Sequence, residues 1–505
     1  MTDQPDSVDD VMNSPEGSQA EEDPERRDFL KGVSAAAAGG ATMLAGCSGG
    51  GGGGGDGGDG GDGGDGGGGD GGDGGDGGGG DGGGSSTSET VHFISMEQSP
   101  AFKEFWNKTG SQFEEQTGTS VNVTYAWDTG YNKRIAQLLQ AGDPPDVINL
   151  EEFNVGQYVT QNLLADVTDV VDDFKEKTNF PSQYRIKYEG GDRWFPSFCA
   201  PNVRWYRGDV MEEVGFEGSS ALGTPTTYEE WGDFMQTVDE EKDDMAGGSI
   251  ATGATFLGTN TTLCHIWASG ARTTQWASDS NEQIEAALPD YKQEIKASLD
   301  YLKDFYEYSA DTANWSWTET TDAFANGDVG ESFYGGARPQ VQAHKRGRSW
   351  AQDVTLGPFP NNPDADNDVD YTFPSGWGIM DGGQATEAAK EYVSMIMMDD
   401  DLLTEFYQIT PVHNAPLSES RRDPSHPMWD VDLVNNSMTS EQIGFYLDQI
   451  PKGQPIAAET QPPNYKASSA FTTFGLGDLV YEYVNQGNSL DSAIEAAVTQ
   501  MQGAL

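Results

Sequence analysis

The chain contains 505 residues and carries a formal net charge of −55 at pH 7. A negative charge of this size repels nucleic acid and anionic lipid headgroups, so both are excluded as partners. The 12 Trp, 19 Tyr and 22 Phe residues supply ample core material, which excludes intrinsic disorder of the whole chain. The acidic residues are dispersed and lysines are few, which indicates a halophilic surface whose self-repulsion is screened by salt.

Two adjacent arginines, a short apolar run and a cysteine indicate an export signal near the N-terminus. Arg26-Arg27-Asp28-Phe29-Leu30-Lys31 precedes the run Val33 to Leu44, which leads into Ala45-Gly46-Cys47. The run is about a dozen residues long, whereas a helix needs about 20 to cross the ~30 Å hydrocarbon core. The alternative is a buried Ala-rich helix.

This pattern resembles a twin-arginine signal of the haloarchaeal type that ends in a lipoprotein box. The resemblance implies that residues 1–46 are removed and that Cys47 carries a lipid. The mature protein would then be tethered to the extracellular face of the cell membrane. The number of lipid chains stays open.

Residues 47–88 are expected to form a linker between the lipid and the folded part. Residues 48–84 are almost wholly glycine with Asp at intervals of about three. A calcium-binding β-roll needs an apolar residue in each turn, and these residues supply none. We therefore expect a flexible, self-repelling spacer with a reach of roughly 30–35 Å.

Alternating strands and helices are predicted from residue 91 onward. Residues 91–94 form a β-rich run, and residues 99–117 carry aromatic side chains at helical spacing. Apolar and polar residues alternate over 121–127, which predicts a strand. Residues 131–139 have an amphipathic helical pattern, and residues 146–150 give a third strand. This order favours an α/β fold with a parallel sheet covered by helices.

Further fragments follow one another in the order of a known family. They are LLQAGDPPDVINLEEFNVGQYVTQNLLADV, WYRGD with MEEVGF, TPTTYEEWGDFMQTV, FANGDVGESFYGG, FPSGWGIM with ATEAAKEYVSMIM, and NSLDSAIEAAVTQMQGAL. Within the third fragment, Thr227 and Glu230 have the spacing of a capping box at a helix start. Together the fragments resemble family 1 of the extracellular solute-binding proteins, the maltose-binding type, which serve ABC importers.

The resemblance implies a type II periplasmic-binding-protein fold, with two α/β lobes, a hinge and a ligand cleft between the lobes. One lobe is expected at 89–200 plus 330–390, and the other at 201–329 plus 391–505. The resemblance also implies a monomer that delivers a sugar or oligosaccharide to ABC permease subunits, without catalysis and without a cofactor. Where the family carries a Trp and an Asp, this chain has Leu150 and Phe153, so an identical ligand is not expected.

Polar and aromatic residues that follow the three predicted strands form the first group of candidate ligand-binding residues. Glu97 follows the first strand, Trp127 and Asp128 end the second, and Glu151 and Glu152 end the third. Sugar recognition needs flat aromatic faces and planar polar side chains whose hydrogen bonds a wrong ligand leaves unmade. All five would project from one edge of the sheet. The alternative for each is a solvated acid or a core tryptophan.

Aromatic residues in Gly-, Ser- or Asn-rich surroundings form the second group, namely Trp205, Trp267, Trp315, Trp317, Tyr334 and Trp377. Each covers either a ligand or the core. Trp377 is the preferred stacking residue, because Gly376 and Gly378 would let a ligand approach closely. Arg338 is suited to donate paired hydrogen bonds to sugar hydroxyls or a carboxylate, and its alternative is a surface ion pair.

Signals for an enzyme or a metal site are weak. The sequence has no Gly-x-Ser-x-Gly, His-Glu-x-x-His or phosphate-binding Gly-Lys-(Ser/Thr) pattern, and no Cys/His cluster that suggests zinc. Cys199 and Cys264 either pair outside the cell or remain two buried thiols. The alternative functions are a surface-displayed carbohydrate-active enzyme and an adhesive surface protein.

Overall fold

The computed structural model describes residues 89–126, 129–278, 280–313, 315–362, 365 and 371–505. The predictions for the signal, the spacer and the lipid on Cys47 lie outside these residues, as do those for Trp127 and Asp128. The five predicted elements between residues 91 and 150 are all present as strands or helices.

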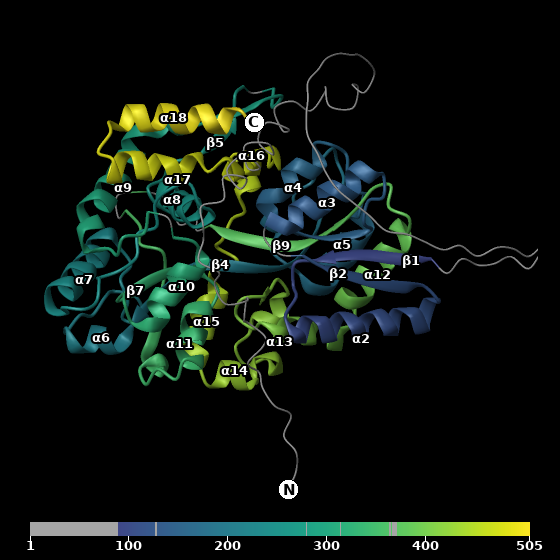
Figure 1. Cartoon of the computed structure of the whole chain (residues 1–505), viewed down its shortest axis with the longest axis horizontal. Coiled ribbons are helices and arrows are strands. Elements are labelled where there is room, and N and C mark those ends of the chain that lie inside the picture. Colours follow the sequence, from purple (N-terminus) through teal and green to yellow (C-terminus); the bar gives the residue numbers. More distant parts are fainter. Residues whose placement is uncertain (1–88, 127–128, 279, 314, 363–364, 366–370) are drawn as a thin grey trace, which may run out of the picture.

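A mixed sheet in the order β10-β4-β9-β3-β1-β2 is the centre of the structure (Figure 1). β1 pairs parallel with β2 and β3, as predicted, whereas β9 pairs antiparallel with β3 and β4. The strands of this sheet are β1 (Thr90–Ser95), β2 (Ser120–Tyr125), β3 (Val147–Glu151), β4 (Phe195–Arg207), β7 (Glu331–Gly335), β8 (Val354–Gly357), β9 (Thr372–Ile379) and β10 (Ala415–Pro416). A separate hairpin consists of β5 (Thr274–Trp276) and β6 (Ile284–Ala286).

β4 connects the two halves of the molecule, and all 13 of its residues are buried. Its first part, Phe195–Pro201, pairs with β9, whereas its second part, from Asn202 onward, pairs with β7 and β8. Figure 1 shows two bodies joined by this strand. We call the body around β1, β2 and β3 the first lobe, and the body around β7 and β8 the second lobe.

Helices cover both lobes. In chain order they are α2 (Pro100–Thr117), α3 (Thr129–Ala141), α4 (Glu152–Val159), α5 (Thr168–Thr178), α6 (Gly208–Glu213), α7 (Tyr228–Glu241), α8 (Phe256–Ala268), α9 (Lys292–Phe305), α10 (Trp317–Asn326), α11 (Arg338–Lys345), α12 (Thr386–Met398), α13 (Asp400–Ile409), α14 (Asp432–Asn435), α15 (Ser440–Asp448), α16 (Lys466–Ser469), α17 (Gly475–Val480) and α18 (Leu490–Gln502).

The chain crosses between the lobes more than once. α12 and α13 pack against α2, and α12 also packs against α5 and β1. Residues 386–409 therefore lie with the first lobe, at variance with the expected division that placed residue 391 onward in the other lobe. Residues 331–357, which form β7, α11 and β8, belong to the second lobe, whereas the expected division placed 330–390 in the first. Further along, α16 packs against α4 of the first lobe and α17 packs against α8 of the second. The chain thus passes between the lobes again within residues 466–480.

The second lobe encloses a buried ion pair. Arg204 Nη1 donates to Glu331 Oε2 at 2.7 Å, and both side chains are fully buried. The guanidinium lies 4.0 Å from the centroid of the Trp231 ring and 5.0 Å from that of Phe359. Ser249 N–H donates to the other carboxylate oxygen at 3.0 Å. These contacts replace the water that both charges lose on burial.

The capping box predicted at the start of α7 forms only in part. Thr227 Oγ1 accepts from the backbone N–H of Glu230 at 3.3 Å. The Glu230 carboxylate accepts from Thr226 N–H at 2.9 Å instead of reaching the N–H of Thr227. The helix still begins at the predicted residue, because the N-cap hydroxyl satisfies one of its free amides.

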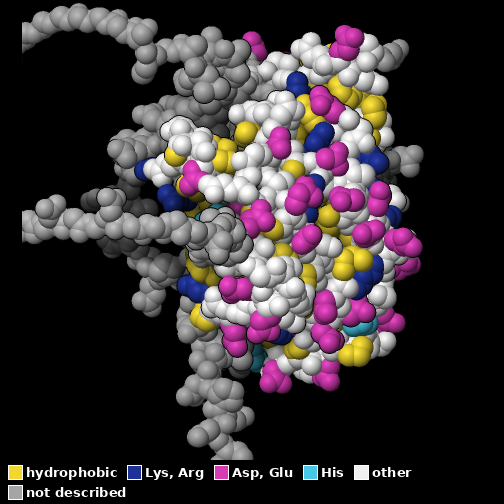
Figure 2. Space-filling model, turned by 90° about the vertical axis from the view of Figure 1, so that its right-hand side faces the viewer, with side chains coloured by type: hydrophobic (Ala, Val, Ile, Leu, Met, Phe, Trp, Pro, Cys, Tyr) yellow, Lys and Arg dark blue, Asp and Glu magenta, His cyan; other side chains and the backbone are white. Residues whose placement is uncertain are grey.

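The surface carries the acidic residues that the composition predicts. Figure 2 shows Asp and Glu side chains scattered over the outer face of the first lobe, with fewer Lys and Arg between them. Among the residues that the structure describes, none of the helices is long and apolar enough to cross a membrane.

Candidate functional site

Two carboxylates lie near the ends of neighbouring parallel strands. β1 and β3 pair with Ile94 opposite Ile148, β3 ends at Glu151, and Glu97 follows the end of β1 by two residues. The carboxyl ends of parallel strands share one edge of the sheet, and the charge of Glu97 raises the pKa of Glu151.

The backbone beyond β1 is fixed although it has left the sheet. Asn149 Oδ1 accepts from Met96 N–H at 2.9 Å, and Tyr131 O–H donates to the Asn149 carbonyl at 2.6 Å. Ser95 Oγ accepts from Glu97 N–H at 3.0 Å and donates to Glu97 O at 3.1 Å. The position of Glu97 is therefore set by hydrogen bonds to β1, β3 and α3.

Glu151 and Glu152 have different roles at the start of α4. Glu151 occupies the N-cap position, but its side chain accepts no capping hydrogen bond from the helix, so its carboxylate is available to the site. Glu152 is fully buried and accepts from Ala457 N–H at 2.8 Å and from Ile456 N–H at 3.3 Å. The prediction that Glu152 contacts a ligand is therefore wrong, because its carboxylate ties α4 to residues 456–458.

Arg338 and Tyr334 of the second lobe meet these carboxylates. Arg338 begins α11 two residues after β7 has turned at Gly336, whose φ of +92° is accessible to glycine at no steric cost. The Arg338 charge opposes the rise that burial causes in the pKa values of Tyr334, Glu97 and Glu151. Four of the predicted site residues, two from each lobe, thus come together.

Burial and the charge of Arg338 determine the direction of the pKa shifts in this group. Burial and the neighbouring Glu97 raise the pKa of Glu151 to about 7, while Arg338 opposes the increase. Burial also raises the pKa of Glu97, again opposed by Arg338. Burial, assisted by Arg338, lowers the pKa of His413 to about 3, so this imidazole is neutral. Near pH 7 the carboxyl pair therefore holds a proton part of the time.

Aromatic rings form the other side of the site. The Phe153 ring of α4 lies 5.5 Å from the Phe256 ring of α8, centroid to centroid, so this contact joins the two lobes. Phe153 also stacks on Phe471 at 5.0 Å, and Phe256 meets the edge of Phe474 at 4.9 Å. Phe256 is 36% exposed, which is exceptional for a large apolar side chain among the described residues. Its ring therefore has a face available to a ligand.

Trp315 and Trp317 complete the aromatic side. Both are partly exposed and pack against each of the two largest groups of buried apolar residues. Thr255 Oγ1, at the start of α8, donates to the Trp315 carbonyl at 3.2 Å. The Trp317 ring lies 5.0 Å from the Tyr334 ring. Ring contacts, one hydrogen bond, electrostatic interactions and chain neighbours therefore connect eight residues, namely Glu151, Phe153, Phe256, Trp315, Trp317, Tyr334, Arg338 and Glu97.

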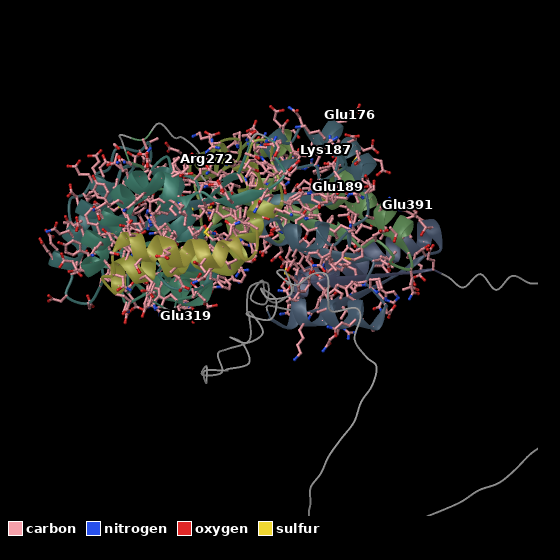
Figure 3. All side chains as sticks on the ribbon, turned by 90° about the horizontal axis from the view of Figure 1, so that it is seen from above. Glu176, Lys187, Glu189, Arg272, Glu319 and Glu391 are labelled. Atoms are coloured by element: carbon pink, nitrogen blue, oxygen red, sulfur yellow. The ribbon has the colours of Figure 1, made fainter. Side chains whose placement is uncertain are left out.

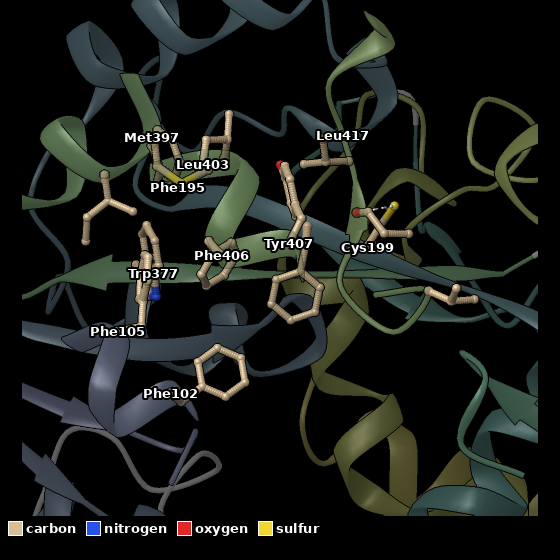
Figure 4. Packing of buried hydrophobic residues seen from close by; sticks show 14 of the residues in the cluster. Phe102, Phe105, Phe195, Cys199, Trp377, Met397, Leu403, Phe406, Tyr407 and Leu417 are labelled. Carbon is tan, nitrogen blue, oxygen red and sulfur yellow. Dashed lines mark hydrogen bonds between the residues drawn. The ribbon is translucent and has the colours of Figure 1, made fainter. Parts of the chain in front are cut away.

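Three tryptophans predicted to stack on a ligand are core residues instead. Trp377 is 2% exposed, stacks on Phe195 at 6.2 Å and meets the edges of Trp106 and Phe406 (Figure 4). The glycine before it serves the sheet, because a Cβ on Gly376 would lie 1.9 Å from Phe195 O. Both faces of the Trp377 ring are therefore covered by protein.

Trp205 and Trp267 are also buried, at 0% and 2% exposure. Trp205 Nε1 donates to the Gly336 carbonyl at 2.9 Å, and Trp267 Nε1 donates to Glu459 Oε1 at 2.6 Å. Their prediction as ligand-binding residues is wrong, because both indole N–H groups are satisfied inside the protein. Cys199 and Cys264 are buried and form no disulfide with each other.

Sequence reasoning missed Phe256 and Phe471 as site residues. Phe256 follows Gly-Ala-Thr at the start of α8. The same criterion that selected the tryptophans, an aromatic residue in glycine-rich surroundings, could have selected it. Within the described part of the chain, no group of three or more His, Cys, Asp or Glu side chains is arranged to hold a metal ion.

Comparison with known proteins places this chain in a family. Residues 108–430 match the model of the bacterial extracellular solute-binding proteins. The chain belongs to this family. No match was found among curated proteins. The family assignment agrees with the resemblance seen in the sequence fragments.

Solved solute-binding proteins have the same fold. An ABC transporter solute-binding protein from Thermotoga lettingae bound with alpha-D-tagatose is 16% identical, with a TM-score of 0.61 over 83% of this chain and 100% of that chain. Maltose-bound MalE3 of T. maritima is 14% identical, with a TM-score of 0.63 over 82% and 100%. The GacH receptor of Streptomyces glaucescens is 16% identical, with a TM-score of 0.62 over 83% and 98%. The predicted two-lobed α/β fold is confirmed.

Proposed function

We propose that the protein is the substrate-binding component of an ABC transporter and that it captures a sugar or oligosaccharide between its lobes. The observation that carries this proposal is the group of connected aromatic and charged residues at the lobe junction. It combines partly exposed aromatic rings, suited to C–H faces of sugar rings, with carboxylate, guanidinium and phenol groups, suited to hydroxyls. Both lobes contribute to it, so a ligand bound there favours the arrangement in which the lobes are closed.

The neighbouring structures support the choice of a carbohydrate. The three neighbours named above were solved with alpha-D-tagatose, maltose and acarbose bound. The fold is shared over almost the whole length of each of these proteins, and the site in this chain offers the same classes of group that sugars require. The solute would then be passed to permease subunits in the membrane, which would recognise the closed form.

A carbohydrate-active enzyme is the less favoured alternative. Glu97 and Glu151 are two neighbouring carboxylates, which glycoside hydrolases also use. Both are coupled to the same guanidinium on the side of the second lobe. The proposal therefore assigns them to hydrogen bonding with solute hydroxyls, with no bond made or broken.

The cellular setting is proposed from the sequence. The twin-arginine signal would direct export, and the lipid on Cys47 and the spacer 47–88 would hold a monomer at the extracellular face of the membrane. A Cys47→Ser variant is expected to be released from membranes into the medium, as followed by fractionation.

The acidic surface would require high salt, so the free energy of unfolding should increase with NaCl concentration.

The function is tested by a thermal-shift screen of sugars, sugar acids and polyols in multimolar NaCl, followed by product analysis. Binding raises the melting temperature according to ligand concentration and affinity. The proposal expects at least one saccharide to raise it without any product being formed. Product formation would favour the enzyme, and the absence of any shift across the screen would contradict the proposal.

A further inference from the structure

Residues 453–462 lie at the junction of the two lobes, and we call them the strap. The strap begins beside two other connections between the lobes. Thr372 N–H, at the start of β9, donates to the Gln454 carbonyl at 3.2 Å, and Thr372 pairs with Pro201 of β4. The next residue of β4, Asn202, already pairs with β7 of the second lobe. Three connections therefore meet at one place, about which the lobes can turn.

The first lobe holds the strap through Glu152. The Glu152 carboxylate, at the start of α4, is fully buried and accepts from Ala457 N–H at 2.8 Å and from Ile456 N–H at 3.3 Å. These two hydrogen bonds fix the backbone of the strap relative to α4. The next residue of α4 is Phe153, so the strap and the aromatic side of the candidate site share this anchor.

The strap holds the second lobe through Glu459, whose buried carboxylate accepts five hydrogen bonds. Oε1 accepts from Trp267 Nε1 and from Thr273 N–H, both at 2.6 Å. Oε2 accepts from Thr274 N–H at 2.9 Å and from the hydroxyls of Thr273 and Thr274 at 2.6 and 2.7 Å. Hydrogen bonds to a charged acceptor are about twice as strong as neutral ones. Glu459 comes two residues after Ala457, so the strap has little slack between its two anchors.

On the outer side of the strap the lobes leave open space between them. Trp276 Nε1 of the β5–β6 hairpin donates to the Pro462 carbonyl at 3.0 Å. Trp276 also lines a cavity of about 260 Å³, together with residues 187–189 of the first lobe. Figure 3 shows Lys187 on the side of the molecule that faces away from Glu319 of α10. The cavity gives the lobes room to move relative to each other, while the strap connects them.

We propose that Glu152 and Glu459 are positioning residues that fasten both lobes to the strap and thereby set the gap between the Phe153 and Phe256 rings. Phe153 follows Glu152 on α4, whereas Phe256 begins α8, the helix whose other end carries Trp267. The two ring centroids are 5.5 Å apart. The consequence for saccharide binding rests on the proposed function. A variable gap leaves a smaller fraction of molecules competent to bind, so the apparent dissociation constant rises.

E459Q tests the second anchor with almost no change in side-chain size. Three of the five donors are N–H groups, which cannot become acceptors, and they face both ends of the carboxylate. In either orientation the glutamine NH2 group therefore opposes at least one N–H. T274V is a milder second variant, because it removes one hydroxyl donor and keeps the branched shape.

The direct measurement is the distance between the lobes in the ligand-free mature chain with Cys47→Ser. Spin labels on E176C and E229C report this distance by pulsed electron paramagnetic resonance. Glu176 is exposed on α5 of the first lobe (Figure 3), and Glu229 is exposed on α7 of the second. The distance distribution is expected to broaden clearly in E459Q and to a smaller extent in T274V. E152Q should broaden it as well.

Affinity is measured by titration calorimetry with maltose, maltotriose and raffinose in constant molar NaCl, at a temperature where circular dichroism shows each variant folded. E459Q is expected to weaken binding roughly threefold or more, as a competent fraction of about one third would produce. The matched control is E331Q, which removes another buried carboxylate of the second lobe, one bound to Arg204 and Ser249. E331Q should lose stability but keep both the distance distribution and the affinity.

The outcomes separate this inference from the proposed function. An unchanged distance distribution in folded E459Q, or an equal broadening in E331Q, would overturn the role of the strap; T274V decides the question if E459Q does not fold. Broadening with unchanged affinity would overturn the claim that the strap sets the gap at the site. If no saccharide binds the wild-type chain and the wider screen gives no shift, the proposed function fails, while the distance distributions still decide whether the two carboxylates position the lobes.

Discussion

Replacing Arg338 by methionine removes the positive charge that faces Glu97 and Glu151 while it keeps much of the apolar stem. Two unit charges about 5 Å apart interact with about 3 kcal/mol at an effective dielectric constant of about 20. The site is partly open, and the pKa of Glu151 of about 7 leaves this carboxyl partly protonated near neutrality. We therefore expect R338M to lower the free energy of unfolding by about 1–3 kcal/mol at pH 8.

The pH dependence of this loss has a defined sign. The pKa of Glu151 is about 7 in the folded protein and 4.5 ordinarily, so the folded state binds more protons between these values. The corresponding stability is fully present below pH 4.5 and is lost as the pH rises through about 7. Because Arg338 lowers the pKa of both carboxyls, removing it raises both further. The deficit of R338M should be small at pH 5 and full at pH 8.

The assay is unfolding by urea, followed by tryptophan fluorescence, at pH 5 and pH 8 in the same NaCl concentration. The matched control is R346M, which removes an arginine from the other end of α11. Arg346 is ion-paired with Asp322 at the surface, and such pairs contribute at most about 1 kcal/mol. A deficit of R338M that is equal at both pH values, or no larger than that of R346M, would refute the reasoning.

Three further outcomes are expected. E331Q should lower the free energy of unfolding by about 3–5 kcal/mol in urea, because it leaves the charge of Arg204 buried without its partner; a loss below 1 kcal/mol would contradict the burial of the pair. F256A should lower the melting temperature modestly, because the ring is 36% exposed but contacts Phe153, Phe471 and Phe474, and should weaken saccharide binding at least fivefold in calorimetry; unchanged affinity would remove Phe256 from the site. In a Cys47→Ser chain, a thiol reagent should modify neither Cys199 nor Cys264 before unfolding, and reductant should not change the melting temperature, because both thiols are buried and not disulfide-bonded to each other; rapid labelling of the native chain would show that they are accessible.

The parts of the site that could be predicted are those set by local periodicity. Residues at the carboxyl ends of parallel strands share one edge of the sheet, so the positions of Glu97 and Glu151 followed from recognising two strands. Tyr334 was selected as an aromatic residue in glycine-rich surroundings, and Arg338 as a guanidinium suited to donate paired hydrogen bonds. In each case a few neighbouring residues carried the information.

The parts that could not be predicted depend on which segments meet in space. Trp377 is core because Trp106, Phe195 and Phe406 arrive from three other elements, and no local pattern reports them. Glycines beside a tryptophan indicate close approach, but they do not say whether a ligand or a strand approaches. Phe256 belongs to the site because α8 faces α4 across the lobe junction.

Solution scattering of the mature chain with and without a saccharide found in the thermal-shift screen tests the central claim most directly. The lobes are proposed to close around the solute, so the radius of gyration should fall when the wild-type chain is saturated. It should not fall in R338M under the same conditions. Saturation of the wild-type chain with an unchanged radius of gyration would contradict the account.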